Sequence, residues 1–367
     1  MRFVVIMKKL IKRFLPHISI LLLFSSCVSD PVEETSFKSY QWELSNPTIE
    51  GFNTDLINSA FSEAMNTGYI NSIVIIRNGK IAVEKYFNGK SVSSYQTIRS
   101  VSKSFLSALF GIAVEKGILS LDRKVVDYFP EYQQFITDSR INNVTIDHLI
   151  KMRAGIKGDQ EFYFTFTNSG DWVKTILSST LSFDPGTRMQ YTTAGTHILS
   201  ALLTRACGKS TFDFAKENFF GPCGFDVRAW PKDPQGNYFG GNDINLTTRD
   251  MAVLGLIYMN KGVLDGKQIV PEDWVNKSLV TYSGTGTTPR GQWSKTGYGY
   301  LWWLGEVSGY KVFSGIGHGG QFVFCVPSLN MIIATQSFPD GDWDSADVQE
   351  RGVISIIANY ILPAAQL

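Results

Sequence analysis

Cysteine and histidine are both scarce in this chain, with only four of each among 367 residues. No two cysteines have the CxxC spacing, and the histidines do not occur at the spacing of metal ligands. The sequence therefore predicts no metal site and no bound cofactor. A GxSxG motif is also absent, which excludes the nucleophile turn of the α/β-hydrolases. The four histidines are His17, His148, His197 and His318.

Excess charge of one sign is lacking too, because 34 basic and 33 acidic residues leave a net charge of +1. Such a chain has no strong field to attract nucleic acid or an anionic surface, and we expect no nucleic-acid partner. Hydrophobic residues make up 44% of the chain and charged residues 18%, which is an ordinary globular composition. This length suits one large core or two closely packed ones.

The first 27 residues are organised like a secretion signal. Basic residues occur between positions 8 and 13, and the apolar run Ile18–Phe24 is too short to cross a bilayer comfortably as a permanent helix. Ser25 and Ser26 directly before Cys27 resemble a bacterial lipoprotein cleavage box. We therefore predict a lipoprotein signal peptide over 1–27 with lipidation of Cys27. A plain signal peptide or an uncleaved anchor is the alternative.

A polar segment over 28–47 follows and is predicted to be a tether. In this interpretation the protein is exported and held at a membrane, on the periplasmic face or the cell surface, by its N-terminal lipid. Three cysteines remain after Cys27, so at least one of them is unpaired. Cys207 and Cys223 can form a bridge in an oxidising compartment, whereas burial of all three as small hydrophobic side chains is the alternative.

Strand patterns occur at both ends of the chain and helical patterns in its middle. Asn78-Gly79 separates two β-branched runs, 73–76 and 81–86, which is a strong hairpin signal. Ser102–Lys116 is apolar over most of its surface, as is typical of a helix buried at the centre of a domain. Helical patterns follow at Ala194–Cys207, Phe212–Phe219 and Thr248–Asn260, strand patterns at Tyr298–Gly305, 311–313, 322–326 and 331–335, and a last helical pattern at Val353–Leu362.

These patterns predict an α+β fold in which early and late strands form one antiparallel sheet, flanked by the terminal helices. We assign residues 48–125 and 285–367 to this α/β lobe and residues 126–284 to a mainly helical second lobe. A cleft between two lobes is a usual place for a site.

The strongest chemical motif is Ser100-Val101-Ser102-Lys103, directly before the buried helix. Residues three apart on a helix share a face, so the serine hydroxyl and the lysine amine can meet. Burial and the positive end of the helix both disfavour a charged ammonium, and a neutral lysine can accept the serine proton. Backbone N–H groups at the helix start can hold an oxyanion. A second S-x-x-K, Ser308 to Lys311, runs into a predicted strand and is interpreted as chance.

Two further segments carry candidate site residues. Tyr191 follows the Asp184-Pro185-Gly186-Thr187 turn, and a tyrosine near a charged lysine gives up its proton more easily; a core tyrosine is the alternative. The segment Gly315–Gln321 matches G-x-G-x-x-G. A strand pattern rather than a helix follows it, so we reject a dinucleotide site. Its glycines instead permit a close backbone approach, and His318 can line the cleft.

In this order, the three segments resemble the class C β-lactamase and penicillin-binding-protein-like serine hydrolases, a family that includes esterases, DD-peptidases and 6-aminohexanoate-oligomer hydrolases. Supporting matches are Gly117–Asp122, Thr145–Leu149 and Asp184–Thr187. The resemblance spans about residues 60–340 and implies the β-lactamase/transpeptidase-like fold. Residues 48–367 would then form a serine hydrolase domain that cleaves a small-molecule or peptide-like ester or amide.

The resemblance also implies a role for each matching residue. Ser100 is the acylated nucleophile, Lys103 activates it, and Tyr191 is the general base and acid. The oxyanion hole is made by the backbone N–H groups of Ser100 and Gln321. The substrate is bound by Thr193 in the second motif and by His318, Gly319 and Gly320 in the third.

Two departures from the family pattern affect the expected activity. The usual Tyr-x-Asn is Tyr191-Thr192-Thr193 here, and Thr193 cannot offer an amide to a substrate. His318 stands where β-lactamases have a lysine that holds the β-lactam carboxylate; a literal Lys295-Thr296-Gly297 is interpreted as chance. We therefore expect an esterase or amidase rather than a β-lactamase. A non-catalytic cell-envelope protein that binds peptide or peptidoglycan on the same fold is the alternative.

Overall fold

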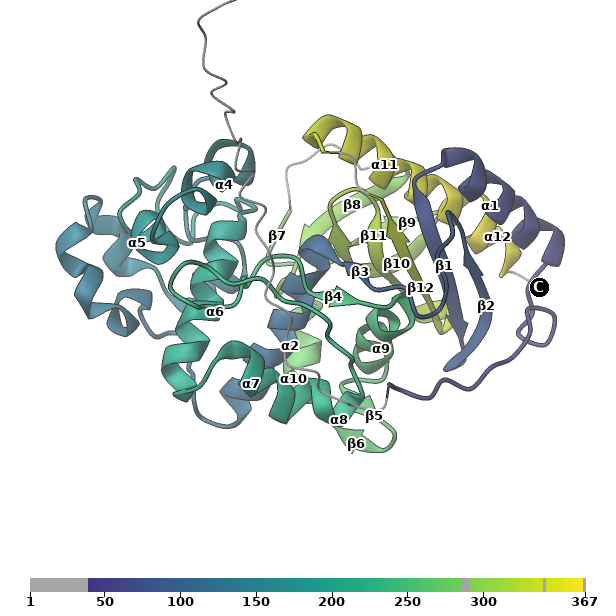
Figure 1. Ribbon diagram of the computed structural model, residues 1–367, viewed down its shortest axis with the longest axis horizontal. Coiled ribbons are helices and arrows are strands. Elements are labelled where there is room, and N and C mark those ends of the chain that lie inside the picture. The colour runs from purple at the N-terminus through teal and green to yellow at the C-terminus, as the bar shows by residue number, and fades with distance from the viewer. Residues whose placement is uncertain (1–38, 285–290, 339–340, 366–367) are drawn as a thin grey trace, which may run out of the picture.

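The computed structural model describes residues 39–284, 291–338 and 341–365, and Figure 1 shows its two parts, one built around a sheet and one of helices. The predicted signal peptide and Cys27 lie outside these residues. Within the described ranges, no helix is long and apolar enough to cross a membrane.

An eight-stranded antiparallel sheet forms the first lobe, with the strand order β2-β1-β12-β11-β10-β9-β8-β7. The hairpin predicted at Asn78-Gly79 joins β1 to β2, and both turn residues have positive φ, of 53° and 80°. The predicted sheet of early and late strands is confirmed, because β1 pairs with β12. The strands are β1 Ile70–Arg77, β2 Lys80–Tyr86, β7 Ser283–Gly284, β8 Trp293–Tyr298, β9 Trp303–Val307, β10 Tyr310–Gly317, β11 Gln321–Val326 and β12 Met331–Ser337.

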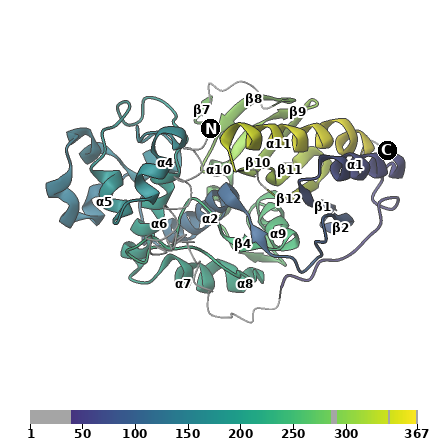
Figure 2. The same cartoon turned by 45° about the horizontal axis from the view of Figure 1, so that its top comes forward.

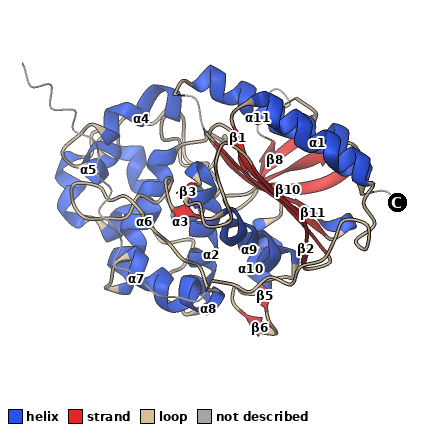
Figure 3. Cartoon of the chain, turned by 45° about the vertical axis from the view of Figure 1, so that its right-hand side comes forward, coloured by secondary structure: helices blue, strands red, loops and turns tan. Residues whose placement is uncertain are grey.

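Helices cover both faces of this sheet. The terminal helices α1 (Thr54–Thr67) and α11 (Trp343–Ile356) pack together with the short α12 (Leu362–Ala364), and they lie across one face as predicted (Figures 2 and 3). On the other face lie α2 (Ser102–Glu115), α9 (Thr248–Met259) and α10 (Glu272–Ser278). The central strands β11 and β12 are buried along their whole length because both of their faces are covered.

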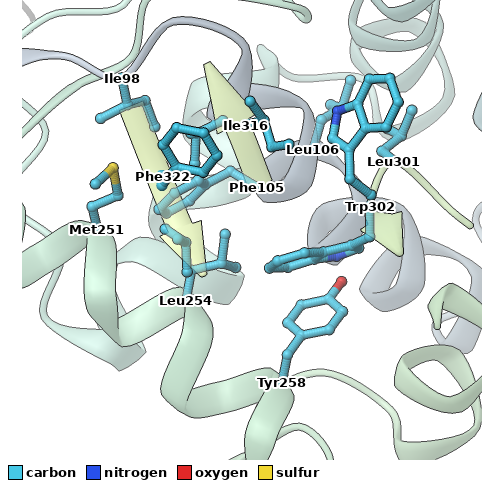
Figure 4. Close-up of a cluster of buried hydrophobic side chains, with 14 of the residues drawn as sticks. Ile98, Phe105, Leu106, Met251, Leu254, Tyr258, Leu301, Trp302, Ile316 and Phe322 are labelled. Carbon is cyan, nitrogen blue, oxygen red and sulfur yellow. The ribbon is translucent and has the colours of Figure 1, made fainter. Parts of the chain in front are cut away.

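The buried centre of the molecule is the interface between α2, α9 and the sheet. Twelve of the fourteen residues of α2 are buried, as its apolar composition predicted. Figure 4 shows Phe105 of α2, Leu254 and Tyr258 of α9 and Phe322 of β11 in one cluster, and the ring centroids of Tyr258 and Trp302 are 4.5 Å apart. The first turns of α2 pack into this core through Phe105 and Leu106.

The helical lobe is arranged around α6 (Thr193–Cys207), which contacts α2 and four helices of its own lobe. Thr145 caps α3, since its side chain accepts from the backbone N–H of His148. The surrounding helices are α3 Ile146–Ile150, α4 Asp159–Thr167, α5 Trp172–Leu177 and α7 Thr211–Ala215.

Three expectations differ from the structure. Helix α9 packs on β1, β11 and β12, so it lies with the sheet and not with the helical lobe expected over 126–284. The strand expected over Tyr298–Gly305 is broken, because Gly299 donates to the carbonyl of Trp302 and closes a turn between β8 and β9. Residues 40–45 of the expected tether pair with the domain, where Ser45 donates to Ile81 and Tyr40 to Gly224.

Cys207, Cys223 and Cys325 are free thiols, so Cys207 and Cys223 do not form the bridge that the sequence allowed.

Candidate active site

Ser100 lies in a single 3-10 turn, η1 (Arg99–Val101), that leads directly into α2. Arg99 has φ 47°, a left-handed conformation that turns the chain sharply before the serine. The turn packs against β10 and β11. A side chain at Gly317 of β10 would lie 2.5 Å from the carbonyl oxygen of Ile98, so only glycine allows this approach. The glycine-rich strand edge thus meets the serine turn itself.

Lys103 is the second residue of α2, one turn after Ser100, and is 1% exposed. Its Nζ lies 2.9 Å from Ser100 Oγ, as the S-x-x-K spacing predicted. Two further oxygens complete its surroundings, Thr193 Oγ1 at 3.0 Å and the carbonyl of Gly241 at 2.7 Å. A lysine ammonium has three N–H donors, and here each one has an acceptor.

The electrostatics of Lys103 suit a base that works near neutrality. Burial lowers its pKa to about 8, and the nearby carboxylates of Asp159 and Asp243 act in the opposite direction. A lysine with this pKa is partly neutral near pH 7, so it can take a proton from a hydroxyl that lies within hydrogen-bonding distance.

Asp159, the first residue of α4, is a site residue that sequence reasoning missed. Its Oδ1 accepts from the backbone N–H of Thr193 at 2.5 Å and its Oδ2 from the Thr193 hydroxyl at 2.7 Å. Burial raises the pKa of Asp159, and the charge of Lys103 partly offsets this rise. No motif marks Asp159, because its contact with Thr193 is tertiary.

The same hydrogen bonds correct the role expected of Thr193. This residue was expected to bind substrate, yet it is 1% exposed and its hydroxyl bridges Asp159 and Lys103. Threonine is shorter than the asparagine that is usual at this position of the motif. Its side chain stays buried, where its hydroxyl accepts from Lys103.

A loop before α9 completes the surroundings of Lys103 and was also missed. Gly241 supplies its carbonyl to Lys103, and a side chain on it would lie 2.4 Å from Thr196 Oγ1. Asp243 accepts from Thr97 Oγ1 at 2.6 Å and from the Arg99 guanidinium at 3.3 Å, which ties the loop to the serine turn. The Gly240-Gly241 pair in the sequence was the available signal for a close backbone approach.

Tyr191 lies in the segment before α6, beside Lys103. Lys103 Nζ is 4.9 Å from the centre of the Tyr191 ring, and that ring stacks on Trp303 of β9 with centroids 5.5 Å apart. This tyrosine of the helical lobe is therefore positioned by contacts with α2 and β9 of the sheet lobe. An electron-rich ring at this distance stabilises the protonated lysine.

The turn between β10 and β11 brings the third motif to the same edge of the sheet. His318 is half-buried, whereas Gly319 and Gly320 are buried and have φ of 79° and 103°. Gln321 begins β11 opposite Gly317, and its side chain is buried against Ser337, to which it donates and from which it accepts. Its side chain is thus committed to the sheet.

An aromatic bridge joins the two lobes next to this turn. The Trp343 ring at the start of α11 contacts Tyr163 of α4 and His318, with centroids 6.2 and 5.0 Å apart. Of the phenylalanines in α4, Phe162 and Phe166 are core residues, whereas Phe164 is exposed.

The two motif copies interpreted as chance lie away from the serine turn. Lys295 is in β8, two strands from β10, and its ammonium is paired with Glu306 at 2.7 Å. Ser308 is an exposed residue of the β9–β10 turn, so it shares no helix face with Lys311.

A buried lysine that contacts a serine at the start of a central helix, between an antiparallel sheet and a helical lobe, is typical of the β-lactamase-like serine hydrolases that the sequence resembles. A Beta-lactamase family model matches residues 58–341, so the chain belongs to this family and is a serine hydrolase of the β-lactamase type.

Relatives of similar sequence agree with this family, and solved structures share the fold. The chain is 25% identical over 297 residues to the 6-aminohexanoate-dimer hydrolase of Paenarthrobacter ureafaciens. This match covers 74% of this chain and 73% of that protein. The fold is similar to a putative 6-aminohexanoate-dimer hydrolase from Bacillus anthracis (TM-score 0.73, 19% identity, 92% of this chain and 90% of that one). It is also similar to a putative β-lactamase from Bacteroides dorei (TM-score 0.71, 17% identity, 86% and 100%).

Proposed function

We propose that this protein cleaves a small amide or ester by forming an acyl-enzyme on Ser100. The observation that carries the proposal is the 2.9 Å contact between Ser100 Oγ and a buried lysine whose pKa is about 8. A serine hydroxyl is a weak nucleophile unless a base takes its proton, and Lys103 is that base.

In the first half of the reaction, the proton of Ser100 passes to neutral Lys103 while Oγ bonds to the carbonyl carbon. The carbonyl oxygen becomes an anion, which the backbone N–H groups of Ser100 and Gln321 stabilise. Collapse of this intermediate breaks the bond to the leaving group, which receives a proton from the Lys103–Tyr191 pair. Water then attacks the acyl-enzyme with the same pair as base, and Ser100 is regenerated.

Tyr191 is proposed to pass the proton between Lys103 and the leaving group. The 4.9 Å contact of its ring with Lys103 Nζ supports this role, because it brings the tyrosine side chain next to the base. The stacking on Trp303 holds the ring in place during the transfer.

Several observations favour an ester or amide over a β-lactam. Thr193 is committed to Asp159 and Lys103, and His318 lies against the Trp343 ring where a β-lactamase has a carboxylate-binding lysine. The aromatic bridge of Tyr163, Trp343 and His318 suits an apolar part of the substrate. A relative whose name states that it hydrolyses a 6-aminohexanoate dimer also supports a small open-chain substrate.

The protein is further proposed to work at a membrane surface as an exported lipoprotein. The support for this proposal is the basic stretch, the short apolar run and the Ser25-Ser26-Cys27 box. Lipidation of Cys27 would hold the hydrolase at the periplasmic face or on the cell surface.

Mass spectrometry after exposure to a fluorophosphonate tests the nucleophile. We expect one covalent adduct on Ser100, and its loss in Ser100→Ala without a change in thermal unfolding. Ser308→Ala is the matched control, since it removes the serine of the second S-x-x-K and should leave the adduct in place. A folded wild-type protein that forms no adduct would overturn the proposal and favour a non-catalytic, peptide-binding protein of the cell envelope.

A further inference from the structure

Both carboxylate oxygens of Asp159 are bonded to one residue, Thr193, which also contacts Lys103. Oδ1 accepts from the Thr193 backbone N–H at 2.5 Å and Oδ2 accepts from the Thr193 hydroxyl at 2.7 Å. The charge of Lys103 and the two hydrogen bonds from Thr193 favour the ionised form of Asp159. Since an ionised carboxylate can only accept, the single proton of the Thr193 hydroxyl points at Asp159.

This direction of the proton limits what Thr193 can offer to Lys103. A hydroxyl that donates to Asp159 has only lone pairs left for the lysine, which lies at 3.0 Å. The carbonyl of Gly241 at 2.7 Å is likewise an acceptor only. Of the three oxygens around Nζ, Ser100 Oγ alone can donate.

A neutral lysine amine has two N–H donors and one lone pair. If the two donors satisfy Thr193 and Gly241, the lone pair is left facing the hydroxyl of Ser100. We propose that Asp159 is a positioning residue that fixes the Thr193 hydroxyl and thereby turns the lone pair of Lys103 toward Ser100. The inference rests on the proposed function of Ser100 and Lys103.

Asp159 also contributes charge to this group. Three groups face Lys103: the carboxylate of Asp159 from α4, the carboxylate of Asp243 from the loop before α9, and the ring of Tyr191. Asp243 is paired with Arg99. The negative charge of Asp159 raises the pKa of Lys103 against the effect of burial. Removal of that charge therefore lowers the pH at which Lys103 becomes neutral.

Asp159→Asn tests both effects. The amide nitrogen can donate to the Thr193 hydroxyl, whose own proton then competes for the lone pair of Lys103. We expect kcat for a 4-nitrophenyl ester to fall about 100-fold, at the lower end of what general-base catalysis contributes. The rising limb of kcat/KM against pH should move to lower pH. Asp171→Asn, which alters a carboxylate that caps α5, is the control and should leave this limb in place.

A double-mutant cycle separates this role from a merely structural one. Thr193→Val removes the hydroxyl, so the misdirected proton no longer exists, and Asp159→Asn/Thr193→Val should be no slower than Thr193→Val alone. Independent effects would instead multiply. Thr193→Ser keeps the hydroxyl and should lose much less activity than Thr193→Val.

The outcomes distinguish this inference from the proposed function. A folded wild-type protein that forms no fluorophosphonate adduct would overturn the proposed function itself. A labelled, active wild type together with an Asp159→Asn variant of unchanged rate and unchanged pH limb would overturn only the inference. If Asp159→Asn does not fold, Thr193→Val against Thr193→Ser decides, because equal rates and pH limbs in these two variants would overturn it.

Discussion

Lys103 is the residue whose surroundings make the reaction sensitive to pH. Burial holds its pKa at about 8, and only the neutral amine can accept the Ser100 proton. We therefore expect kcat/KM for a neutral ester to rise as the pH increases through about 8 and to level off above it. The measurement is a pH–rate profile of the wild-type protein from pH 5 to 10. A profile that is flat over this range would contradict the role of Lys103.

The residue scale also shows how far sequence reasoning can reach into such a site. Ser100 and Lys103 were predictable because three residues of helix are enough to bring them together. The contact of Asp159 with Thr193 joins residues 34 positions apart in different elements, and no local pattern encodes it. For the same reason, Thr193 was assigned to the substrate although its side chain is buried in the wall.

At the scale of elements, the start of α9 contains a second buried carboxylate. Asp250 caps the helix together with Thr247, whose hydroxyl donates to Asp250 Oδ2 and accepts from its N–H. Burial raises the pKa of Asp250 to about 7 from an ordinary value of 3.8. The folded state thus holds this proton more tightly than the unfolded chain. The resulting stability is fully present below about pH 4 and is lost as the pH rises through about 7.

Asp250→Asn should remove this pH dependence. The free energy of unfolding of the wild type should fall relative to the variant between pH 4 and 8, by a few kcal/mol at about 1.4 kcal/mol per pKa unit. Urea denaturation at several pH values measures it. Asp213→Asn, at the exposed start of α7, is the matched control. If the free energies of unfolding of the wild type and of Asp250→Asn differ by the same amount across this range, burial does not shift the pKa of the Asp250 carboxyl.

Elements with a strong periodic or turn signal were predicted well, whereas their partners were not. The Asn78-Gly79 hairpin and the buried helix α2 follow from local chemistry. The helix α9 was recognised but assigned to the wrong lobe, because an apolar helix surface does not specify the surface that covers it. The break between Tyr298 and Trp303 was missed because both flanking segments are rich in aromatic residues that suit strands.

At the scale of the whole molecule, the predicted lipid anchor decides where the hydrolase would act. We expect the mature protein to begin at Cys27 with a mass increment for lipid, and we expect Cys27→Ser to shift the protein from the membrane fraction to the soluble one. Intact-mass spectrometry and fractionation of the producing cells measure this. A mature chain that begins elsewhere and carries no lipid would instead support a plain signal peptide.

Whole-molecule architecture was predictable in outline, since strands at both chain ends and helices between them indicate an inserted helical lobe. The path of residues 40–45 was not, because a polar segment of this kind has no pattern that distinguishes a tether from a strap. Its hydrogen bonds to Ile81 and Gly224 connect β2 of the sheet to a segment from the middle of the chain.

The pairing of β1 with β12 has a consequence for synthesis. Ile70 leaves the ribosome long before Ser337, its partner in the finished sheet, and at ~5–20 residues per second the delay is tens of seconds. Throughout that time the apolar strand β1 has one unsatisfied edge, and until β10 is made the serine turn lacks the strand that supports it. The nascent chain is therefore exposed to aggregation until almost its last residues are made, and a stop codon before β12 should yield an inactive, insoluble product.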